Sequence, residues 1–554
     1  MKKQNFLKGS LILMISALTA KLLGALFKIP LTNMLGGVGM SYFSCAYSIF
    51  MPIYALTVTG LSSAVARMTA QSVAFGMYDN AKRVRKTALM LFSVAGAAGS
   101  LLTIVLAKPF CIYAAKCPEA QTAVIMIAPS VLFGCITAVE RGYYEGLCNM
   151  YPTAFSQLTE GIVKMCAGLM LCQYVNEQST AVLSYFPNGT DIRAVSAAVG
   201  ILGVTLSSIG AALFFVIVRI FERKKANNGE KTLISHRRIA KELTSIALPT
   251  GVSAVVTNLT AIIDMGTIIG CIAYFGSRTS IPNGISAGDM PHFVYGSFAG
   301  IALTVFNLIP SVTNMLGKGV LPSITCAWEN KNNSAMNKST MQALLTSAFI
   351  AVPTAFGMGV LSGEILHFLF PNQKDEVELC INSLRLLMPG MVCLCVSFPI
   401  FSMLQAIGKA SVPLKTLIFG AGIKLVGNII LIPMIGVNGA AISTSFCYMV
   451  ILILSLSIYL QETSVTICVK PLLSILYAGA MCGAAAYLAS DVLKMNNYGN
   501  TVVLLGAVSV GGAVYFVVIC ALKDTLLNYT EKTYNGYRKF NCRKKIKGQH
   551  KATL

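Results

Sequence analysis

Apolar runs of about 20 residues recur along almost the whole length of this chain. A run of that length crosses the hydrocarbon core of a bilayer, about 30 Å thick, as one helix. Continuous runs such as 89–107 and 440–459 show no alternating polar face, which the strands of a membrane β-barrel would require. The sequence therefore predicts an all-α membrane protein that crosses the bilayer several times.

Composition supports this prediction. Hydrophobic residues make up 55% of the 554 residues and charged residues only 12%, whereas soluble domains carry about 25% charged residues. The first run, 7–29, follows two lysines and is similar to a signal peptide. It is too long for one and contains Lys21 and Lys28, so we interpret it as a retained helix.

Charged residues, prolines and polar clusters divide the apolar sequence into about fourteen predicted spans. They lie near 8–29, 41–66, 87–107, 121–140, 154–174, 194–219, 243–271, 292–316, 341–361, 380–404, 413–432, 437–459, 470–490 and 500–521.

The cations are distributed unequally around these spans. With the N-terminus inside the cell, about 31 of the 43 Lys and Arg residues fall on the cytoplasmic side, about 7 outside and about 5 within spans. We therefore expect a multi-pass protein of the bacterial cytoplasmic membrane with both termini in the cytoplasm. The formal charge of +22 then acts as an orientation signal and does not indicate a nucleic-acid partner, although the basic tail can also bind anionic lipids.

Cysteines and histidines show no metal-binding pattern. The 17 cysteines contain no CxxC pair and lie largely in apolar runs, where Cys behaves as a small hydrophobic residue. The four histidines are scattered without the spacing of a metal site. We expect no disulfide framework, no metal and no cofactor.

A weak internal repeat appears at a shift of about 260 residues. Under this shift Pro129 falls on Pro389, and Lys164 falls on Lys424. The repeat predicts two six-helix halves with the same orientation and a substrate cleft between them. The predicted divisions are an N-terminal lobe 1–222, a basic linker 223–241, a C-terminal lobe 242–460, two additional helices 461–522 and a basic tail 523–554.

Three cations are candidates for substrate binding, because a charge within a span is costly and usually faces a cavity or a partner. Lys21 and Lys28 are two turns apart on a similar face of the first span, and Arg67 ends the second span. Arg suits a diphosphate, since its planar fork binds two oxygens at once. The alternatives are that Lys28 extends to the outer interface and that Arg67 only anchors its helix.

Other charges are candidates for coupling or for structural ion pairs. Glu160 and Lys164 are spaced i,i+4, so we expect them to pair, with a role of Glu160 in transport as the alternative. Asp264 has a predicted depth in the membrane close to that of Lys21, and the two are candidate partners. The alternative is that Asp264 is an isolated acid near the outer surface. Arg141 and Lys424 complete this group.

Three sequence segments carry a resemblance to a known family. They are Phe6 to Ser10, Met51 to Tyr54 with Gly60 to Ser62, and Arg141 to Gly146 followed by Pro152 to Ala154. Together they resemble the stage V sporulation protein B group, in the polysaccharide-transporter branch of the multidrug/oligosaccharidyl-lipid/polysaccharide (MOP) exporter superfamily, near the MurJ-type lipid II flippases. The resemblance implies fourteen helices, two six-helix lobes, a central cavity and a lipid groove at the last two helices.

The resemblance also implies a cationic cavity lined by the first, second and eighth helices. Lys21, Lys28 and Arg67 match this arrangement by helix and by depth. The predicted eighth span, from His292 to Gly317, contains no Lys or Arg, so the match is incomplete.

The function expected on these grounds is the flipping of a lipid-linked oligosaccharide, such as lipid II, by a monomer that contacts membrane lipids. The alternative is a multidrug or cation antiporter of the related MATE branch, which would favour carboxylates over cations within the membrane. A membrane enzyme finds no support, because no catalytic constellation or long soluble loop is apparent.

Overall fold

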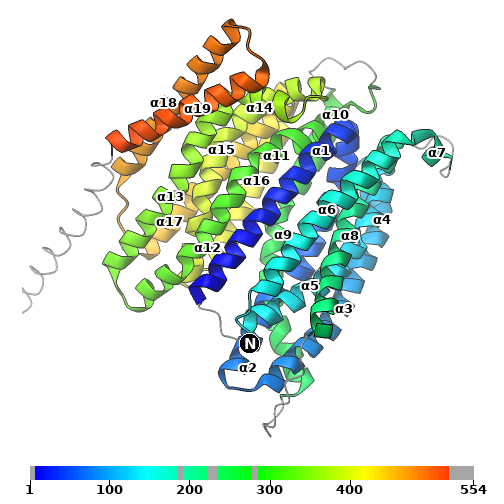
Figure 1. Ribbon diagram of the computed structural model, residues 1–554, viewed down its shortest axis with the longest axis vertical. Helices are drawn as coiled ribbons and strands as arrows, with labels where there is room; N and C mark the ends of the chain where they lie inside the picture. Colours follow the sequence, from blue (N-terminus) through cyan, green and yellow to red (C-terminus); the bar gives the residue numbers. More distant parts are fainter. Residues whose placement is uncertain (1–5, 185–190, 222–233, 277–284, 464, 523–554) are drawn as a thin grey trace, which may run out of the picture. The chain divides into compact units, whose positions relative to one another are not determined.

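The computed structural model describes residues 6–184, 191–221, 234–276, 285–463 and 465–522. Within these ranges the secondary structure is helical throughout (Figure 1). The described part of the chain contains 11 helices that are long and apolar enough to cross a membrane, or up to 12 if a bent pair counts as one span. The predicted all-α multi-pass fold is confirmed, and each of the fourteen predicted segments coincides with helix, but fourteen crossings stay a prediction.

The first half of the chain forms eleven α-helices with short π-helical and 3₁₀ turns between some of them. The α-helices are α1 (Phe6–Tyr54), α2 (Leu61–Ala74), α3 (Tyr78–Pro109), α4 (Gln121–Ile127), α5 (Pro129–Gly146), α6 (Tyr151–Glu177), α7 (Ser179–Leu183), α8 (Ile192–Phe221), α9 (His236–Phe275), α10 (Met290–Ser297) and α11 (Leu303–Phe306). The π-helical turns are Ala55–Thr59, Phe110–Ala114 and Phe298–Ala302, and the 3₁₀ turn is Pro118–Ala120.

The second half forms eight α-helices. They are α12 (Leu308–Glu329), α13 (Asn333–Val360), α14 (Ser362–Leu369), α15 (Lys374–Ala406), α16 (Ser411–Ile435), α17 (Val437–Glu462), α18 (Val469–Met495) and α19 (Asn500–Ala521). The last two lie within 461–522, the segment predicted to form two additional helices.

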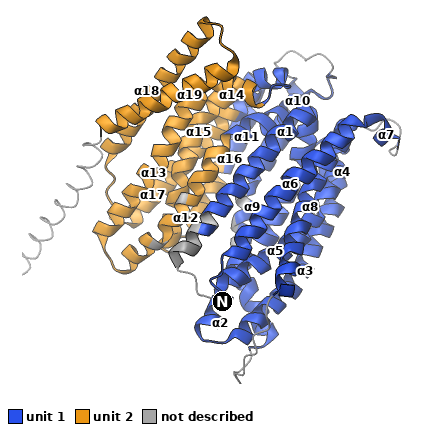
Figure 2. Cartoon of the chain, viewed as in Figure 1, with its two compact units in different colours: residues 1–305, 370–380, 421–440 blue, residues 306–369, 381–420, 441–554 orange. Residues whose placement is uncertain are grey.

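The chain divides into two compact units (Figure 2). Unit 1 comprises residues 1–305, 370–380 and 421–440, and unit 2 comprises 306–369, 381–420 and 441–554. These units do not follow the repeat, since parts of α15 and α16 belong to unit 1. The predicted lobes 1–222 and 242–460 therefore stay a prediction; residues 236–241 of the predicted linker belong to α9, and the tail 523–554 lies outside the described residues.

A glycine divides α1 into two helical parts. Gly36 has φ +66° and ψ −179°, a conformation that only glycine adopts at low cost, and Gly37 and Gly39 follow it. This break separates the first two predicted spans. In unit 1 the second part of α1 approaches α10 closely, because a methyl group built on Gly37 would lie 2.7 Å from Ser297 Oγ.

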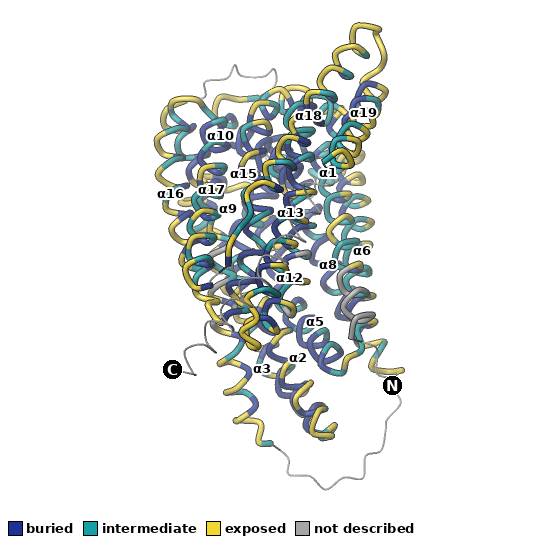
Figure 3. Tube along the Cα trace, turned by 90° about the vertical axis from the view of Figure 1, so that its left-hand side faces the viewer, coloured by how far each residue is buried: buried dark blue, intermediate teal, exposed yellow. Residues whose placement is uncertain are grey.

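Each unit has its own apolar core and a largely apolar exterior. One core in unit 1 contains Leu61, Val84 and Tyr144, and one in unit 2 contains Ile324, Met403 and Tyr459. Exposed residues run along α16 and α19 (Figure 3), and their large side chains are apolar, including Ile418, Phe419, Val426, Leu505, Val508 and Phe516. Exposed apolar faces of this extent are typical of helices that contact lipid.

Candidate functional site

Helices α1 and α6 of unit 1 pack closely enough to place polar side chains of both side by side. A methyl group on Gly161 would lie 2.8 Å from Leu23 Cδ1, and one on Gly168 would lie 2.6 Å from Phe27 Cε2. Small residues of this kind allow membrane helices to approach. Nearby, Ser16 Oγ donates to Gln157 Oε1 at 3.1 Å across the same contact.

Lys28 of α1 is held by a carbonyl of a π-helical turn. Its Nζ donates to Ala299 O at 2.9 Å, and Ala299 belongs to the turn Phe298–Ala302. A π-helical turn interrupts the regular bonding of an α-helix, so its carbonyls are accessible to other donors. The half-buried Lys28 ammonium therefore has a neutral partner.

Lys164 of α6 lies close to Lys28 and is surrounded by aromatic groups. Its Nζ donates to Tyr47 Oη at 3.2 Å and lies 5.0 Å from the centroid of the Phe27 ring. The charges of Lys164 and Lys28 interact with each other. Among the described residues, no carboxylate forms an ion pair with either lysine. Two neighbouring cations without an acid create a local field that favours an anion.

The expected ion pair between Glu160 and Lys164 is wrong. Glu160 Oε2 instead accepts from Arg141 Nη2 at 2.8 Å, and Arg141 Nε donates to Ser156 Oγ at 2.8 Å. Lys164 shares a helix face with Glu160, but the guanidinium of α5 reaches the carboxylate and can satisfy it with a charge-assisted hydrogen bond. The Arg141 guanidinium of α5 thereby neutralises Glu160, and among the described residues Lys164 forms no ion pair with a carboxylate.

The candidate pairing of Asp264 with Lys21 is also wrong, and Asp264 is not an isolated acid either. Asp264 Oδ2 accepts from Lys424 Nζ at 2.7 Å, and Asn428 Nδ2 donates to Asp264 Oδ1 at 3.2 Å. Asn428 also donates to Thr267 Oγ1 at 2.8 Å. The side chains of Lys424 and Asp264 are only 3% and 4% exposed, so both carboxylate oxygens are satisfied inside unit 1.

Lys21 and Arg67 are both exposed, on α1 and α2. Lys21 precedes Lys28 by seven residues, which places it on a similar face about 10 Å along the helix axis. Among the described residues, the Arg67 side chain forms no ion pair or hydrogen bond. The roles of Lys21, Lys28 and Arg67 in substrate binding stay predictions.

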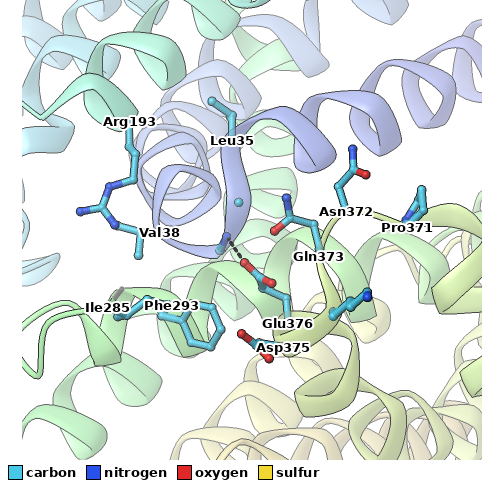
Figure 4. A pocket seen from close by; sticks show the side chains of 13 residues that line it. Leu35, Val38, Arg193, Ile285, Phe293, Pro371, Asn372, Gln373, Asp375 and Glu376 are labelled. Atoms are coloured by element: carbon cyan, nitrogen blue, oxygen red, sulfur yellow. Dashed lines mark hydrogen bonds between the residues drawn. The ribbon is translucent and has the colours of Figure 1, made fainter. Parts of the chain in front are cut away.

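A pocket of about 570 Å³ lies at the break in α1 (Figure 4). Segment 371–376 lines it and holds both ends of the break, since Gln373 Nε2 donates to Asn33 O at 3.0 Å and Glu376 Oε1 accepts from Gly37 N at 3.1 Å. Arg193 contributes its guanidinium from α8. None of the predicted site residues lines this pocket.

Several residues of these arrangements were not identified from sequence. Asn428 follows Lys424 by four residues, so a search for polar residues on the same helix face finds it. Tyr47 belongs to an aromatic stripe with Phe43, Phe50 and Tyr54 at spacings of three and four. No sequence signal connects segment 371–376 to the break in α1.

Comparison with known families gives two matches. Residues 6–328 match the family described as polysaccharide biosynthesis protein. Residues 297–430 match the MatE family.

Relatives and a solved structure extend over almost the whole chain. The chain is 24% identical to the lipid II flippase MurJ of Bacillus subtilis (strain 168), covering 92% of this chain and 94% of the relative. It is 23% identical to stage V sporulation protein B of the same organism, covering 94% and 96%. The structure of the lipid II flippase MurJ in its inward closed conformation aligns with a TM-score of 0.61 at 15% identity, covering 93% of this chain and 100% of that one, and so shows the same fold.

Proposed function

Since the chain belongs to the polysaccharide biosynthesis protein family, we propose that it flips a lipid-linked oligosaccharide across the membrane in which it is embedded. Its resemblance to stage V sporulation protein B and the MurJ flippases of the MOP superfamily is confirmed. Lipid II or a related polyprenyl diphosphate saccharide is the proposed substrate. The protein acts by alternating access, as a monomer in the bacterial cytoplasmic membrane, with both termini in the cytoplasm.

The observation that supports this proposal best is the juxtaposition of Lys28 and Lys164. Both ammonium groups belong to membrane helices, and the Lys28 side chain donates to a neutral carbonyl. A diphosphate group that approaches them gains two favourable charge interactions and relieves their mutual repulsion. The same field disfavours a cationic drug, which would add a third positive charge.

Lys21 and Arg67 extend this cationic region in the proposed mechanism. Lys21, exposed two turns before Lys28, provides a second contact for the head group along α1. The exposed guanidinium of Arg67 holds two phosphate oxygens at once. Binding and release of the head group involve no covalent step, so this mechanism needs no catalytic residue, metal or cofactor.

The alternative, a MATE-type multidrug or cation antiporter, is supported by the match to the MatE family over 297–430. Such an antiporter needs a carboxylate that can exchange a cation. Glu160 and Asp264 are two candidates among the described residues, and each is neutralised by an internal cation, Arg141 or Lys424. This arrangement favours the flippase.

Two experiments test the proposal. The first measures the translocation of lipid II in vesicles that contain the purified protein, and no translocation above empty vesicles would overturn the proposed substrate.

The second experiment tests Lys21→Ala, Lys28→Ala and Arg67→Ala for rescue of a bacterial strain depleted of its own flippase. We expect lost rescue at normal protein abundance, with Lys108→Ala, an exposed lysine of α3, as the control. Normal rescue by all three variants would contradict the assigned binding residues.

A further inference from the structure

Two basic segments that are about 150 residues apart in sequence are fixed to each other at one end of unit 1. Arg83 Nε in α3 donates to His236 Nε2 at the start of α9, at 3.1 Å. His236 Nδ1 is 2.5 Å from Thr87 Oγ1, and Ile234 N donates to Asn80 Oδ1 at 3.2 Å. These contacts join the first turns of the two helices.

Apolar packing orients the two turns. Ala81 and Val84 of α3 are buried in the same core as Ile239 and Leu243 of α9. Arg85 of the same stretch of α3 is buried and pairs with Glu140. The other six cationic side chains of both turns lie away from this core, and five of these six are exposed while Arg83 is half-buried. We call this set the basic patch: Lys82, Arg83, Lys86, Arg237, Arg238 and Lys241.

The basic patch has an excess of positive charge. The same turns contain two carboxylates, Asp79 and Glu242, and Asp79 pairs with Lys82 at 3.3 Å. Within the part of the chain that the structure describes, Lys86, Arg237, Arg238 and Lys241 form no ion pair. The patch is thus able to bind an anion.

The position of the basic patch identifies the kind of anion. Exposed apolar residues begin at Met90 in α3, about one turn beyond Lys86, and at Leu248 in α9, about two turns beyond Lys241. Exposed Phe75 and Tyr78 lie just before α3 and at its start, and aromatic side chains are enriched where membrane helices meet the head groups. The patch accordingly lies at the level of lipid head groups.

We propose that the basic patch binds the head group of an anionic phospholipid in the surrounding bilayer. Charge in loops is sufficient to orient a membrane protein, and that role needs no fixed geometry. Here hydrogen bonds between α3 and α9 assemble one surface from two segments, as a binding site requires. Clusters of four to eight cations next to a membrane helix attract anionic lipids, and each cation contributes to the attraction.

The test measures lipid binding to the purified full-length protein in detergent by native mass spectrometry. Phosphatidylglycerol is titrated, with phosphatidylcholine as the neutral lipid. We expect phosphatidylglycerol to bind preferentially to the unmodified protein. Lys82→Gln/Lys86→Gln and Arg237→Gln/Lys241→Gln should each weaken that binding roughly tenfold.

Two controls distinguish lipid binding at the basic patch from a general effect of net charge and from a loss of folding. Lys108→Gln/Lys116→Gln removes the same charge from exposed lysines elsewhere and should leave binding unchanged. Arg237→Lys/Lys241→Arg keeps the charge and should keep binding. Equal affinity for the two lipids, or weakening in the control as large as in the patch variants, would overturn the proposal, as would a loss confined to one of the two segments.

Discussion

Asp264 and Lys424 form a buried ion pair in which Asp264 Oδ2 and Lys424 Nζ are 2.7 Å apart. The two residues come from α9 and α16, which are 160 residues apart in sequence. Asn428 completes the pair by donating to the second carboxylate oxygen. Neither charge has access to water, so each depends on the other.

Removing one partner of this pair should be more harmful than removing both. Lys424→Met leaves a buried carboxylate without its counter-ion, which typically costs about 3–5 kcal/mol of stability. Asp264→Leu/Lys424→Met replaces the pair by apolar groups and should recover most of this loss. The thermal unfolding midpoint of the purified variants in detergent measures both effects. A double variant less stable than the single one would contradict a purely structural pair.

A charge reversal at Lys164 should abolish transport without unfolding the protein. In Lys164→Glu the new carboxylate lies beside Lys28 and pairs with it, because the two positions already interact electrostatically. The paired lysine then loses its attraction for a diphosphate. Rescue of a flippase-depleted strain should fail at normal protein abundance, whereas Lys164→Arg should retain rescue. Full rescue by Lys164→Glu would remove this pair from the proposed binding site.

The helical fold was predictable because each span is indicated by a local run of apolar residues in the sequence. A run such as 500–521 is apolar throughout, and the lack of water in the bilayer leaves a helix as its way to satisfy the backbone. The break between the first two spans also has a local signal, since Gly36, Gly37 and Gly39 cluster there. Length alone does not fix the number of membrane crossings, because α1 and α2 follow each other with a π-helical turn between them.

The pairing of the charges was not predictable, since it depends on which helices become neighbours. Spacing along α6 favours Glu160 with Lys164, but Arg141 of α5 reaches Glu160 instead. Depth in the membrane suggests Lys21 for Asp264, but α16 brings Lys424 to it. Sequence thus identifies the charged residues, and tertiary packing decides which of them remain without an acid.

Glu364 should make the stability of unit 2 sensitive to acid. Burial raises the pKa of this carboxyl, but hydrogen bonds from Lys494 and Ser490 outweigh burial and hold the pKa below its usual value. A lowered folded pKa contributes stability above the unfolded pKa of about 4.3, and this contribution is lost as the pH falls through the folded value.

The comparison for this prediction is between the wild-type protein and Glu364→Gln. At pH 7 the wild type should be more stable by roughly 1 kcal/mol or less, since Lys494 is half exposed. The difference in unfolding midpoint should shrink as the pH falls below about 4. Glu329→Gln, at an exposed carboxylate, serves as the control. A constant difference across this range would show that the ionisation of Glu364 is not the cause.

Gly296 should tolerate no larger residue, because α10 and α1 are in backbone contact there. A methyl group at Gly296 would overlap Gly37 O and lie 2.6 Å from Ser41 N. Both are backbone atoms, so no side-chain rotation relieves the clash, and the helices have to separate at a cost of about 1–3 kcal/mol or more. Gly296→Ala should therefore lower the unfolding midpoint and the yield of folded protein.

The matched control for Gly296→Ala is Gly266→Ala in α9. A methyl group there meets nothing within 4 Å, and the higher helix propensity of Ala adds up to about 1 kcal/mol of stability. If the two variants were equally stable, the close contact between α1 and α10 would not exist in the folded protein.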